Sequence, residues 1–299
     1  MSSIGTGTPA AAPVEPVEPP VVEPQVSERA KRGKWRRFAL LTAGALVVFF
    51  PIYWMLVTAL STQADLVGSD FYLWPAHLRF DNFSRAWNSL PFSTWYVNSL
   101  LIAVVAVVLT VGINLMAGYV FAKYRFPGRT ALFLLVVSTL MIPVQVIMVP
   151  QFRIVSQLGW VDSYWAVIVP RAAEAFGIFL ARQYMLSIPD EVIEAARIDG
   201  AGHLRTFWSV ILPLCRPLVA VLVILTFMYR WNEFAWPLIV LKDSQLFTVP
   251  IGLAFLQGQY GTDYPALMGM ALVSTLPVLA VFALFQKQFV EGAARSGLR

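Results

Sequence analysis

Six long apolar stretches constrain the fold of this 299-residue chain more than any other feature. A helix needs roughly 20 residues to cross a hydrocarbon layer that is roughly 30 Å thick. Stretches of this kind lie near residues 38–60, 98–122, 131–151, 164–186, 217–240 and 265–286. Because the backbone polar groups of a segment in lipid must bond within that segment, each stretch should form an α-helix. The sequence therefore predicts an all-α, polytopic membrane protein with six transmembrane helices.

The composition favours a membrane protein over a soluble one. Hydrophobic residues make up 58% of the chain and charged residues 13%, whereas a soluble domain carries roughly 25% charged residues. Cys215 is the only cysteine, which excludes an internal disulfide, and His77 and His203 are the only histidines, so we expect no metal site. The basic residues stand at the ends of apolar stretches rather than in one patch, so we expect no nucleic-acid partner.

The first apolar stretch has two interpretations. Val57-Thr58-Ala59 resembles the small-residue cleavage site of a secretory signal. The apolar run before it is longer than that of a signal peptide, however, and five further stretches follow it. We therefore interpret residues 38–60 as a true membrane helix.

Lysine and arginine predict the orientation of the chain, because cytoplasmic segments beside spans carry an excess of both. The loops expected outside hold only Arg79, Arg85, Arg153 and Lys242. An even number of spans places both termini on one side, which is then the cytoplasm. The basic residues expected there are Arg29, Lys31, Arg32, Lys34, Arg36, Arg37, Lys123, Arg125, Arg129, Arg197, Arg205, Arg216, Lys287, Arg295 and Arg299.

The spans divide the chain into four predicted regions. The first is rich in Pro, Glu and small residues, which predicts a disordered cytoplasmic tail. The external loop 61–97 carries aromatic residues suited to a membrane interface, namely Tyr72, Trp74, Trp87, Trp95 and Tyr96. The regions are the tail at 1–30, the first helix and external loop at 31–93, the remaining five helices at 94–287, and a cytoplasmic tail at 288–299.

Residues 187–216 are the most polar long stretch in the second half of the chain, and they predict a short amphipathic helix. Pro189 suits a first helical position, and Asp190 and Glu191 place negative charge where the helix dipole favours it. One face of this helix would carry Val192, Ala195, Ala196 and Asp199.

A second short helix is expected after a glycine turn. Gly200 can end the first helix because glycine tolerates the left-handed backbone of a C-cap. The second helix would run from about His203 to Leu212, where Pro213 stops it. Helices of about ten residues are marginal alone in water, so this segment must dock on a partner or pack as a solvated loop under its own bundle.

The spacing of residues in this segment points to a partner. Glu194-Ala195-Ala196, Gly200, Val210 and Leu212-Pro213 follow the pattern E-A-A-x3-G-x9-I-x-L-P, with Val210 in place of Ile. This pattern, between the fourth and fifth spans, resembles the EAA loop of the membrane subunits of ABC importers.

Further stretches resemble the carbohydrate-uptake branch of that family, which includes the six-span maltose permease subunit. The resemblance covers about residues 38–292, although the ending "AARSGLR" departs from the usual Gly-Ala-Val-Lys-Gly. The matching stretches are "NSLL" (98–101), "YRFPGR" (124–129), "MIPVQVIMVPQF" (141–152), "RWNEFAWPL" (230–238) and "QKQFVEG" (286–292).

The resemblance implies a type I ABC importer transmembrane domain whose EAA loop docks on a separate ATPase. Glu194 would offer a charge to an arginine of the ATPase, and Gly200 would make the turn between the two helices. Ala195 and Ala196 would let the two backbones approach closely. Apolar anchorage would come from Val192 and Ile193, with Leu212 and Pro213 closing the motif.

The resemblance also implies the partners and the location. A second permease would pair with this chain as a heterodimer, and two ATPase subunits and an extracytoplasmic solute-binding protein would complete five chains. The complex would sit in the cytoplasmic membrane of a prokaryote, in contact with lipid.

ATP chemistry is expected on the partner alone. A phosphate-binding P-loop needs G-x4-G-K-[ST], and no lysine of this chain precedes Ser or Thr. A Ser-His-Asp set is not expected either, since the two histidines lie in an external loop and in residues 187–216. We therefore expect no enzyme activity in this chain and no cofactor of its own, with ATP and magnesium bound by the ATPase.

Ionisable residues inside apolar stretches are costly and usually face a cavity or a partner. Arg171 and Glu174, one turn apart, could pair with each other in the fourth span. Alternatively, some of these groups line a polar path for a hydroxyl-rich solute, or they join helices together. The candidates for the path are Arg171, Glu174, Arg230, Asn232 and Glu233.

Prolines and small residues add two expectations about the spans. Pro170 and Pro237 can loosen the helical backbone near the charged residues. Gly112, Ala117 and Gly118 predict close helix packing in the second span.

Several functions remain open from the sequence. Carbohydrate is the favoured cargo, and an importer of the same build for glycerol 3-phosphate or glycerophosphodiesters is the alternative. A stand-alone secondary transporter would need no ATPase-docking loop and usually shows repeated halves. A membrane-embedded enzyme would need a cluster of His, Asp or Glu at one membrane face, which the sequence does not contain.

Overall fold

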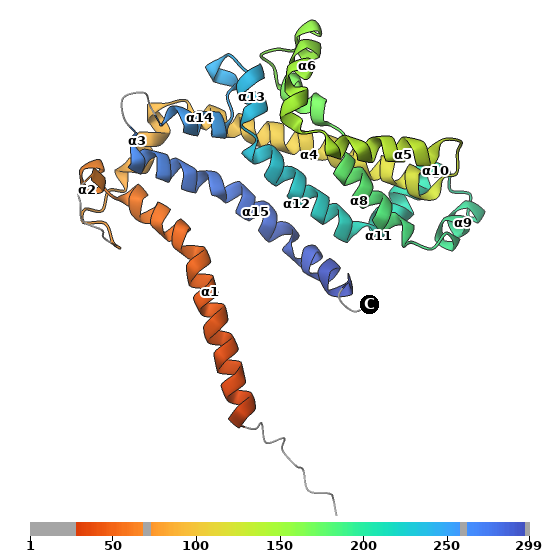
Figure 1. Ribbon diagram of the computed structural model, residues 1–299, viewed down its shortest axis with the longest axis horizontal. Coiled ribbons are helices and arrows are strands. Elements are labelled where there is room, and N and C mark those ends of the chain that lie inside the picture. The colour runs from red at the N-terminus through yellow and green to blue at the C-terminus, as the bar shows by residue number, and fades with distance from the viewer. Residues whose placement is uncertain (1–27, 68–72, 258–261, 297–299) are drawn as a thin grey trace, which may run out of the picture. The chain divides into compact units, whose positions relative to one another are not determined.

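The computed structural model of the chain describes residues 28–67, 73–257 and 262–296 (Figure 1). The predicted N-terminal tail lies outside the described residues up to residue 27, and so does Tyr72 of the predicted external loop. The side chains of the predicted tail at 288–299 also lie outside them.

The chain forms two units, residues 1–51 and 52–299. Helix α1 (Glu28–Leu60) begins in the first unit and ends in the second. The described residues contain no strand. The helices of the second unit are α2 (Gln63–Val67), α3 (Asp81–Ser89), α4 (Phe92–Lys123), α5 (Arg129–Ser138), η1 (Thr139–Met141), α6 (Val144–Gln157), α7 (Tyr164–Ile168), η2 (Val169–Arg171), α8 (Ala175–Leu186), α9 (Glu191–Ile198), α10 (His203–Thr206), η3 (Phe207–Ile211), α11 (Leu212–Leu214), α12 (Arg216–Asn232), α13 (Ala235–Val240), η4 (Ser244–Leu246), α14 (Val249–Phe255) and α15 (Tyr264–Ser296).

Three helices of the described residues are long and apolar enough to cross a membrane singly, namely Trp35–Leu60, Phe92–Lys123 and Tyr264–Lys287. They correspond to the predicted first, second and sixth spans. Three further candidates are pairs of helices bent at a break, so the described part of the chain has up to six spans. The predicted third and fourth spans are therefore not continuous helices, and the third pair, His203–Leu214 with Arg216–Asn232, bends before the predicted fifth span begins.

A proline breaks the predicted span at 131–151. The axes of Arg129–Met141 and Val144–Gln157 meet at 106°, and Pro143 stands between them. The residue before a proline is pushed out of the helical region, and Ile142 is extended at φ −90° and ψ 117°.

The predicted fourth span, residues 164–186, is broken after η2. The two parts are bent by 42°, and Ala172 to Glu174 are not helical. Pro170 in η2 has no N–H to donate to the carbonyl of Ala166, four residues earlier. The indole N–H of Trp236 donates to that carbonyl instead, at 2.8 Å.

The predicted fifth span, residues 217–240, is also broken. Helix α12 ends at Asn232, and Glu233 is extended at φ −68° and ψ 122° before α13 begins. Pro237 lies four residues after Glu233 and cannot donate to its carbonyl, so a continuous helix would leave that carbonyl unbonded. Both predicted proline effects are therefore present at helix breaks.

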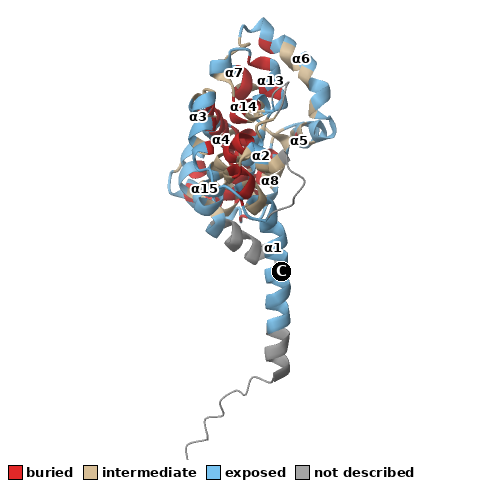
Figure 2. Cartoon of the chain, turned by 90° about the vertical axis from the view of Figure 1, so that its left-hand side faces the viewer, coloured by how far each residue is buried: buried red, intermediate tan, exposed pale blue. Residues whose placement is uncertain are grey.

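The second unit packs around α4. In Figure 1, α12 lies between α4 and α15, and α8 lies along α4. One hydrophobic cluster joins α4, α8, α12 and α15 and extends to Ile193 of α9. A second cluster joins α6, α7, α13 and α14 to Ile102 and Ala106 of α4, and buried residues gather along α4, α7 and α13 in Figure 2.

The predicted external loop, 61–97, is partly core. Helices α2 and α3 lie within it, and Trp74 is exposed as expected of an interface residue. Trp95 is buried instead, and its indole N–H donates to the carbonyl of Ser244 at 2.7 Å. Trp95 is therefore covered by protein rather than exposed, because α4 begins earlier than predicted, at Phe92, and carries this residue into the bundle.

Small residues in α4 have different surroundings. A Cβ atom on Gly118 would stand 2.4 Å from the Cβ of Ala181 and 2.9 Å from the backbone nitrogen of Arg182, both in α8. Gly118 therefore provides the close helix packing that the sequence predicts. Gly112 has no atom within 4 Å of such a Cβ, and Ala117 is half-buried. The prediction of close packing within this chain is wrong for Gly112, because α4 turns that residue away from α8.

We expect Gly118→Ala to lower the stability of the purified chain by about 1–3 kcal/mol, because backbone atoms of α8 cannot move aside for the methyl group. Gly112→Ala in the same helix is the matched control, and we expect it to be neutral or mildly stabilising because alanine favours a helix over glycine. Thermal unfolding in detergent measures both variants. Equal melting temperatures for Gly118→Ala and Gly112→Ala would contradict the close contact between α4 and α8.

Candidate functional site

The predicted coupling segment, residues 187–216, is attached to the end of α4. The Lys123 ammonium donates to the Asp190 carboxylate at 2.6 Å and also to the carbonyl of Ile188. The hydrogen bond from Lys123 lowers the pKa of Asp190 below its usual value. Helix α9 begins at Glu191, directly after this contact, so Pro189 precedes the helix rather than opening it.

Helix α9 packs against the bundle through Ile193 and Ala196. Both are buried, and Ile193 belongs to the same hydrophobic cluster as Phe207 of η3. Of the residues expected to share one face with Ala196, Val192 is half-buried, and Ala195 and Asp199 are exposed. Ala196, expected to contact the ATPase together with Ala195, is therefore covered by this chain, whereas Ala195 remains open.

The outward face of α9 carries a residue that sequence reasoning missed. Glu194 and Ala195 are exposed, and Ile198 beside them has 87% of its surface exposed. Ile198 stands four residues after Glu194 and three after Ala195, and this spacing is the signal that could have identified it.

Gly200 closes α9 as predicted. Its φ is +78°, a conformation that glycine adopts at little cost. The N–H of Gly200 donates to the carbonyl of Arg197, and the N–H of Ala201 donates to that of Ala196, at 3.0 and 2.9 Å. These two bonds form a Schellman motif, which satisfies the last carbonyls of the helix. The backbone of Gly202 is extended at φ −68°, a conformation that other residues can also adopt.

The second short helix is longer than predicted. It runs from His203 to Leu214 through the π-helical turn η3 and α11, so Pro213 does not end it. Pro213 lies in the first turn of α11, where a missing N–H is tolerated. The Tyr124 hydroxyl and Nδ1 of His203 lie 2.8 Å apart, which joins this helix to the loop after α4. Leu212 is half-buried, and Pro213 is exposed.

Four charged residues meet where the fourth and fifth spans are broken. Arg171 pairs with Glu233 at 3.3 Å, and Arg230 pairs with Glu174 at 3.5 Å. Arg230 also contacts Glu233 at 3.4 Å. We call these four residues the charge cluster. Among the ion pairs of the described residues none joins Arg171 to Glu174, so the predicted pair within one span is replaced by pairs between spans. The residues between Arg171 and Glu174 are not helical, which removes the spacing on which the prediction rested.

Polar groups of neighbouring helices satisfy the broken backbone around the charge cluster. The carbonyl of Arg171 accepts hydrogen bonds from the Arg230 guanidinium and from the Thr110 hydroxyl, the latter at 3.2 Å. The N–H of Glu174 donates to Oδ1 of Asn114 at 3.1 Å. Unbonded backbone groups are costly in an apolar environment, so these contacts permit the break in the fourth span.

The charge cluster has a buried side and an open side. The side chain of Arg230 is fully buried at 0% exposure, and Arg171 and Glu233 are nearly buried. Glu174 keeps 32% of its side chain exposed. Asn232 is exposed beside the cluster, and its amide donates to the carbonyl of Met228 in its own helix. Of the five predicted path residues, Glu174 and Asn232 are thus open, whereas Arg230 is enclosed.

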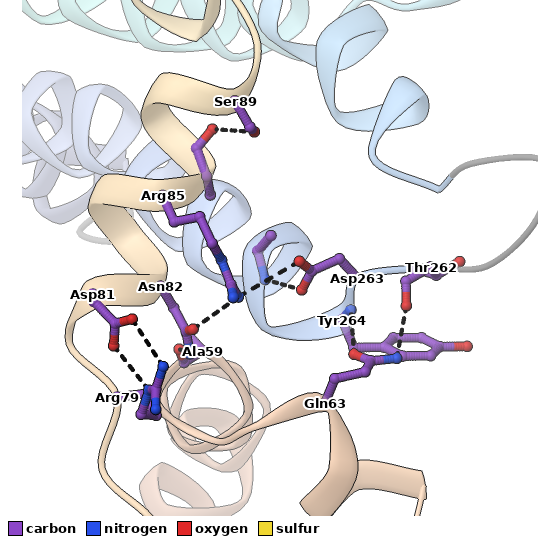
Figure 3. A network of polar contacts seen from close by, with 12 residues as sticks. Ala59, Gln63, Arg79, Asp81, Asn82, Arg85, Ser89, Thr262, Asp263 and Tyr264 are labelled. Atoms are coloured by element: carbon purple, nitrogen blue, oxygen red, sulfur yellow. Dashed lines mark hydrogen bonds and ion pairs between the residues drawn. The ribbon is translucent and has the colours of Figure 1, made fainter.

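A separate polar network joins the end of α1 to α3 and to the start of α15 (Figure 3). The buried Asn82 donates to the carbonyls of Ala59 and Ser61 at 2.9 and 2.8 Å. Arg85 donates to Asn82 and lies 3.6 Å from Asp263. This network fixes the segments at one end of the second unit, where the sequence predicts the outer surface. In the described ranges no group of three or more His, Cys, Asp or Glu could hold a metal ion.

Comparisons with known proteins identify the family. Residues 114–289 match the family described as binding-protein-dependent transport system inner membrane component. The arabinooligosaccharides transport system permease protein AraQ of Bacillus subtilis is 36% identical over 259 residues, which cover 85% of this chain and 92% of that protein. The sn-glycerol-3-phosphate transport system permease protein UgpE of Yersinia enterocolitica is 33% identical over 265 residues, with 86% and 94% covered.

Solved structures share the fold. A chain from the crystal structure of a bacterial ABC transporter involved in the import of the acidic polysaccharide alginate matches with a TM-score of 0.76 and 25% identity. The match covers 89% of this chain and 100% of that chain. A chain from the bacterial alginate ABC transporter in complex with an alginate pentasaccharide-bound periplasmic protein matches with a TM-score of 0.61, 15% identity and coverage of 87% and 96%. This chain therefore belongs to the binding-protein-dependent transport system inner membrane components, as a permease subunit of the ABC importer class.

Proposed function

We propose that this permease imports an oligosaccharide along a path that passes the open side of the charge cluster. The observation that carries the proposal is a net-neutral set of ionic groups at two helix breaks, with Glu174 and Asn232 open beside it. Carboxylate and amide groups can exchange hydrogen bonds with hydroxyl groups. The relative AraQ and the structural neighbour named for alginate import support a carbohydrate as the solute.

Glycerol 3-phosphate is the second candidate solute, and the relative UgpE favours it. A phosphate group is best bound by arginines that are free to donate to it. Both arginines of the charge cluster are already paired, Arg171 with Glu233 and Arg230 with Glu174 and Glu233. A neutral cluster therefore favours an uncharged, hydroxyl-rich solute over a phosphate ester.

The five predicted path residues divide into two roles in this proposal. Glu174 and Asn232 face the solute, because a partly exposed carboxylate in a membrane span must face water or a polar partner. Arg230 and Glu233 hold the broken spans together, since both side chains are almost fully enclosed. Arg171 belongs with Arg230 and Glu233, because its side chain pairs with Glu233 and its carbonyl accepts a hydrogen bond from Arg230.

ATP hydrolysis is proposed to occur on a separate ATPase that binds the coupling segment in the cytoplasm. The exposed Glu194, Ala195 and Ile198 offer that partner one charge, one small residue and one apolar side chain. Ile193 and Ala196 instead attach α9 to the permease itself. ATP and magnesium would be bound by the ATPase and not by this chain.

The complete importer is proposed to contain a second permease and an extracytoplasmic solute-binding protein, in the cytoplasmic membrane of a prokaryote with both termini inside. The structural neighbour complexed with a periplasmic protein supports the binding-protein partner. A transport-active assembly purified with only this chain and the ATPase would contradict the pairing of two permeases.

We expect Glu174→Gln to lower the uptake of a neutral oligosaccharide about tenfold, because a hydrogen bond to a charged group contributes about 1.5–3 kcal/mol. Asp81→Asn is the control, since its exposed pair with Arg79 lies away from the cluster and contributes little. ATP-driven uptake into vesicles that contain the complete importer measures both variants. Unchanged uptake for Glu174→Gln would contradict its contact with the solute, and uptake of glycerol 3-phosphate in place of sugars would contradict the solute class.

We expect Glu233→Ala to reduce the yield of the assembled complex. Its removal leaves Arg171 without its ion-pair partner and Arg230 with Glu174 alone, and breaking a buried pair costs about 3–5 kcal/mol. The neighbouring Asn232→Ala is the matched control, because its exposed amide bonds only within its own helix. Size-exclusion chromatography of solubilised membranes gives both yields. A yield for Glu233→Ala equal to that of Asn232→Ala would show that the charge cluster does not hold the spans together.

We expect Gly200→Val to weaken binding of the ATPase while the chain still inserts in the membrane at normal levels. A β-branched residue cannot adopt a φ of +78° without strain, so α9 would change direction. Gly202→Val, two residues later, is the control because its φ of −68° suits any residue and its surroundings are open.

Glu194→Lys tests the same contact through charge, because an exposed positive residue would face the proposed arginine of the ATPase and like charges at an interface cost several kcal/mol. Co-purification of the ATPase and solute-stimulated ATP hydrolysis are measured together. Wild-type values of both for Gly200→Val and Glu194→Lys would indicate a solvated loop without a coupling role.

A further inference from the structure

A groove of about 380 Å³ lies at the bend between the second short helix and α12. Helix α12 and the helix before it, His203–Leu214, meet at 83°. Apolar side chains of η3, α11, α12 and α15 form most of the groove. Its lining includes Trp208, Leu212, Arg216, Val219 and Phe285.

The bend places this groove at the edge of the membrane. If α12 crosses the bilayer along its normal, a helix at 83° to it runs close to the plane of the bilayer. A helix in that plane lies at the boundary between headgroups and acyl chains. Trp208 of this helix has half of its surface exposed, and tryptophan is enriched at membrane interfaces.

Among the described residues that line the groove, Arg216 is the only charged one, so the described lining is positive. No ion pair joins Arg216 to another described residue. Its side chain is exposed, as is that of Lys287, further along α15. The cytoplasmic leaflet carries anionic lipids, which attract basic groups beside a span. Apolar walls with a single cation at the membrane edge match the two parts of an anionic lipid.

We propose that this groove binds a phospholipid with an anionic headgroup from the cytoplasmic leaflet. The Arg216 guanidinium donates hydrogen bonds to the lipid phosphate, and one acyl chain lies against Leu212, Val219 and Phe285. Trp208 sits at the level of the headgroup. The proposal rests on the cytoplasmic location of the coupling segment, but it requires neither the solute nor the ATPase.

The lipid also has a consequence for coupling. The groove lies where the last helix of the coupling segment meets α12, so its occupant contacts both sides of the bend. A bound lipid would hold the angle at which α12 meets the helix from His203 to Leu214. We therefore expect anionic lipid to raise the fraction of ATP hydrolysis that is coupled to uptake.

Native mass spectrometry of the full chain in mild detergent tests the site directly. The chain is mixed with phosphatidylglycerol or phosphatidylcholine of identical acyl chains, and the retained lipid is counted. We expect the wild type to retain more phosphatidylglycerol than phosphatidylcholine. Arg216→Gln should retain about fivefold less phosphatidylglycerol than the wild type. Arg216→Lys keeps the charge and should restore much of the preference, which separates loss of binding from loss of folding.

Arg153→Gln is the matched control, since Arg153 is an exposed arginine on α6, far along the chain from the groove. The proposal is overturned if the wild type retains both lipids equally, or if Arg153→Gln loses as much phosphatidylglycerol as Arg216→Gln. It is also overturned if a partner protein of the importer displaces the lipid from the wild type, because the groove is then a protein interface. None of these outcomes depends on which solute the importer carries.

Discussion

Ion pairs between two interrupted spans are the interaction on which the rest of this structure depends. A single charge buried in a span is costly, and a buried pair is tolerated only when both partners are present and further bonded. Arg171 of the fourth span pairs with Glu233 of the fifth, and Arg230 of the fifth span pairs with Glu174 of the fourth. Arg230 also donates a hydrogen bond to the carbonyl of Arg171, at the break in the fourth span. The charges are thereby neutralised, and the broken backbone keeps its hydrogen bonds.

The number and class of the helices could be predicted from the sequence, whereas the shape of the central spans could not. Apolar length is a local property, so the stretches at 98–122 and 265–286 correspond to continuous helices. Pro170 and Pro237 indicated where a helix loosens, but not that Trp236 would take the carbonyl freed by Pro170. The pairing of Arg171 with Glu233 joins residues 62 positions apart by their numbers, and no spacing rule reaches that far.

The coupling segment shows the same division between local and distant causes. Gly200 was predictable because a left-handed cap depends only on the residue and its neighbours. The inward face of α9 depends on contact with Phe207, which no helical pattern within α9 contains. Gly112 and Gly118 look alike in the sequence, and only the position of α8 makes one of them a packing contact. The surroundings of Gly112 and the ion-pair partner of Arg171 depend on neighbouring helices, and sequence reasoning misplaced both.

The central claim is that solute passes the open side of the charge cluster. Its most direct test is whether a water-soluble reagent can reach position 174. Cys215 is the only cysteine and is buried, so a Cys215→Ala background permits single-cysteine labelling with a water-soluble maleimide. Glu174→Cys and Asn232→Cys should be labelled in the complete importer, and labelling should fall when solute-loaded binding protein and ATP are added. Leu134→Cys, on the exposed apolar side of α5, should stay unlabelled. If both path variants were as unreactive as Leu134→Cys in every state, the proposed path would be contradicted.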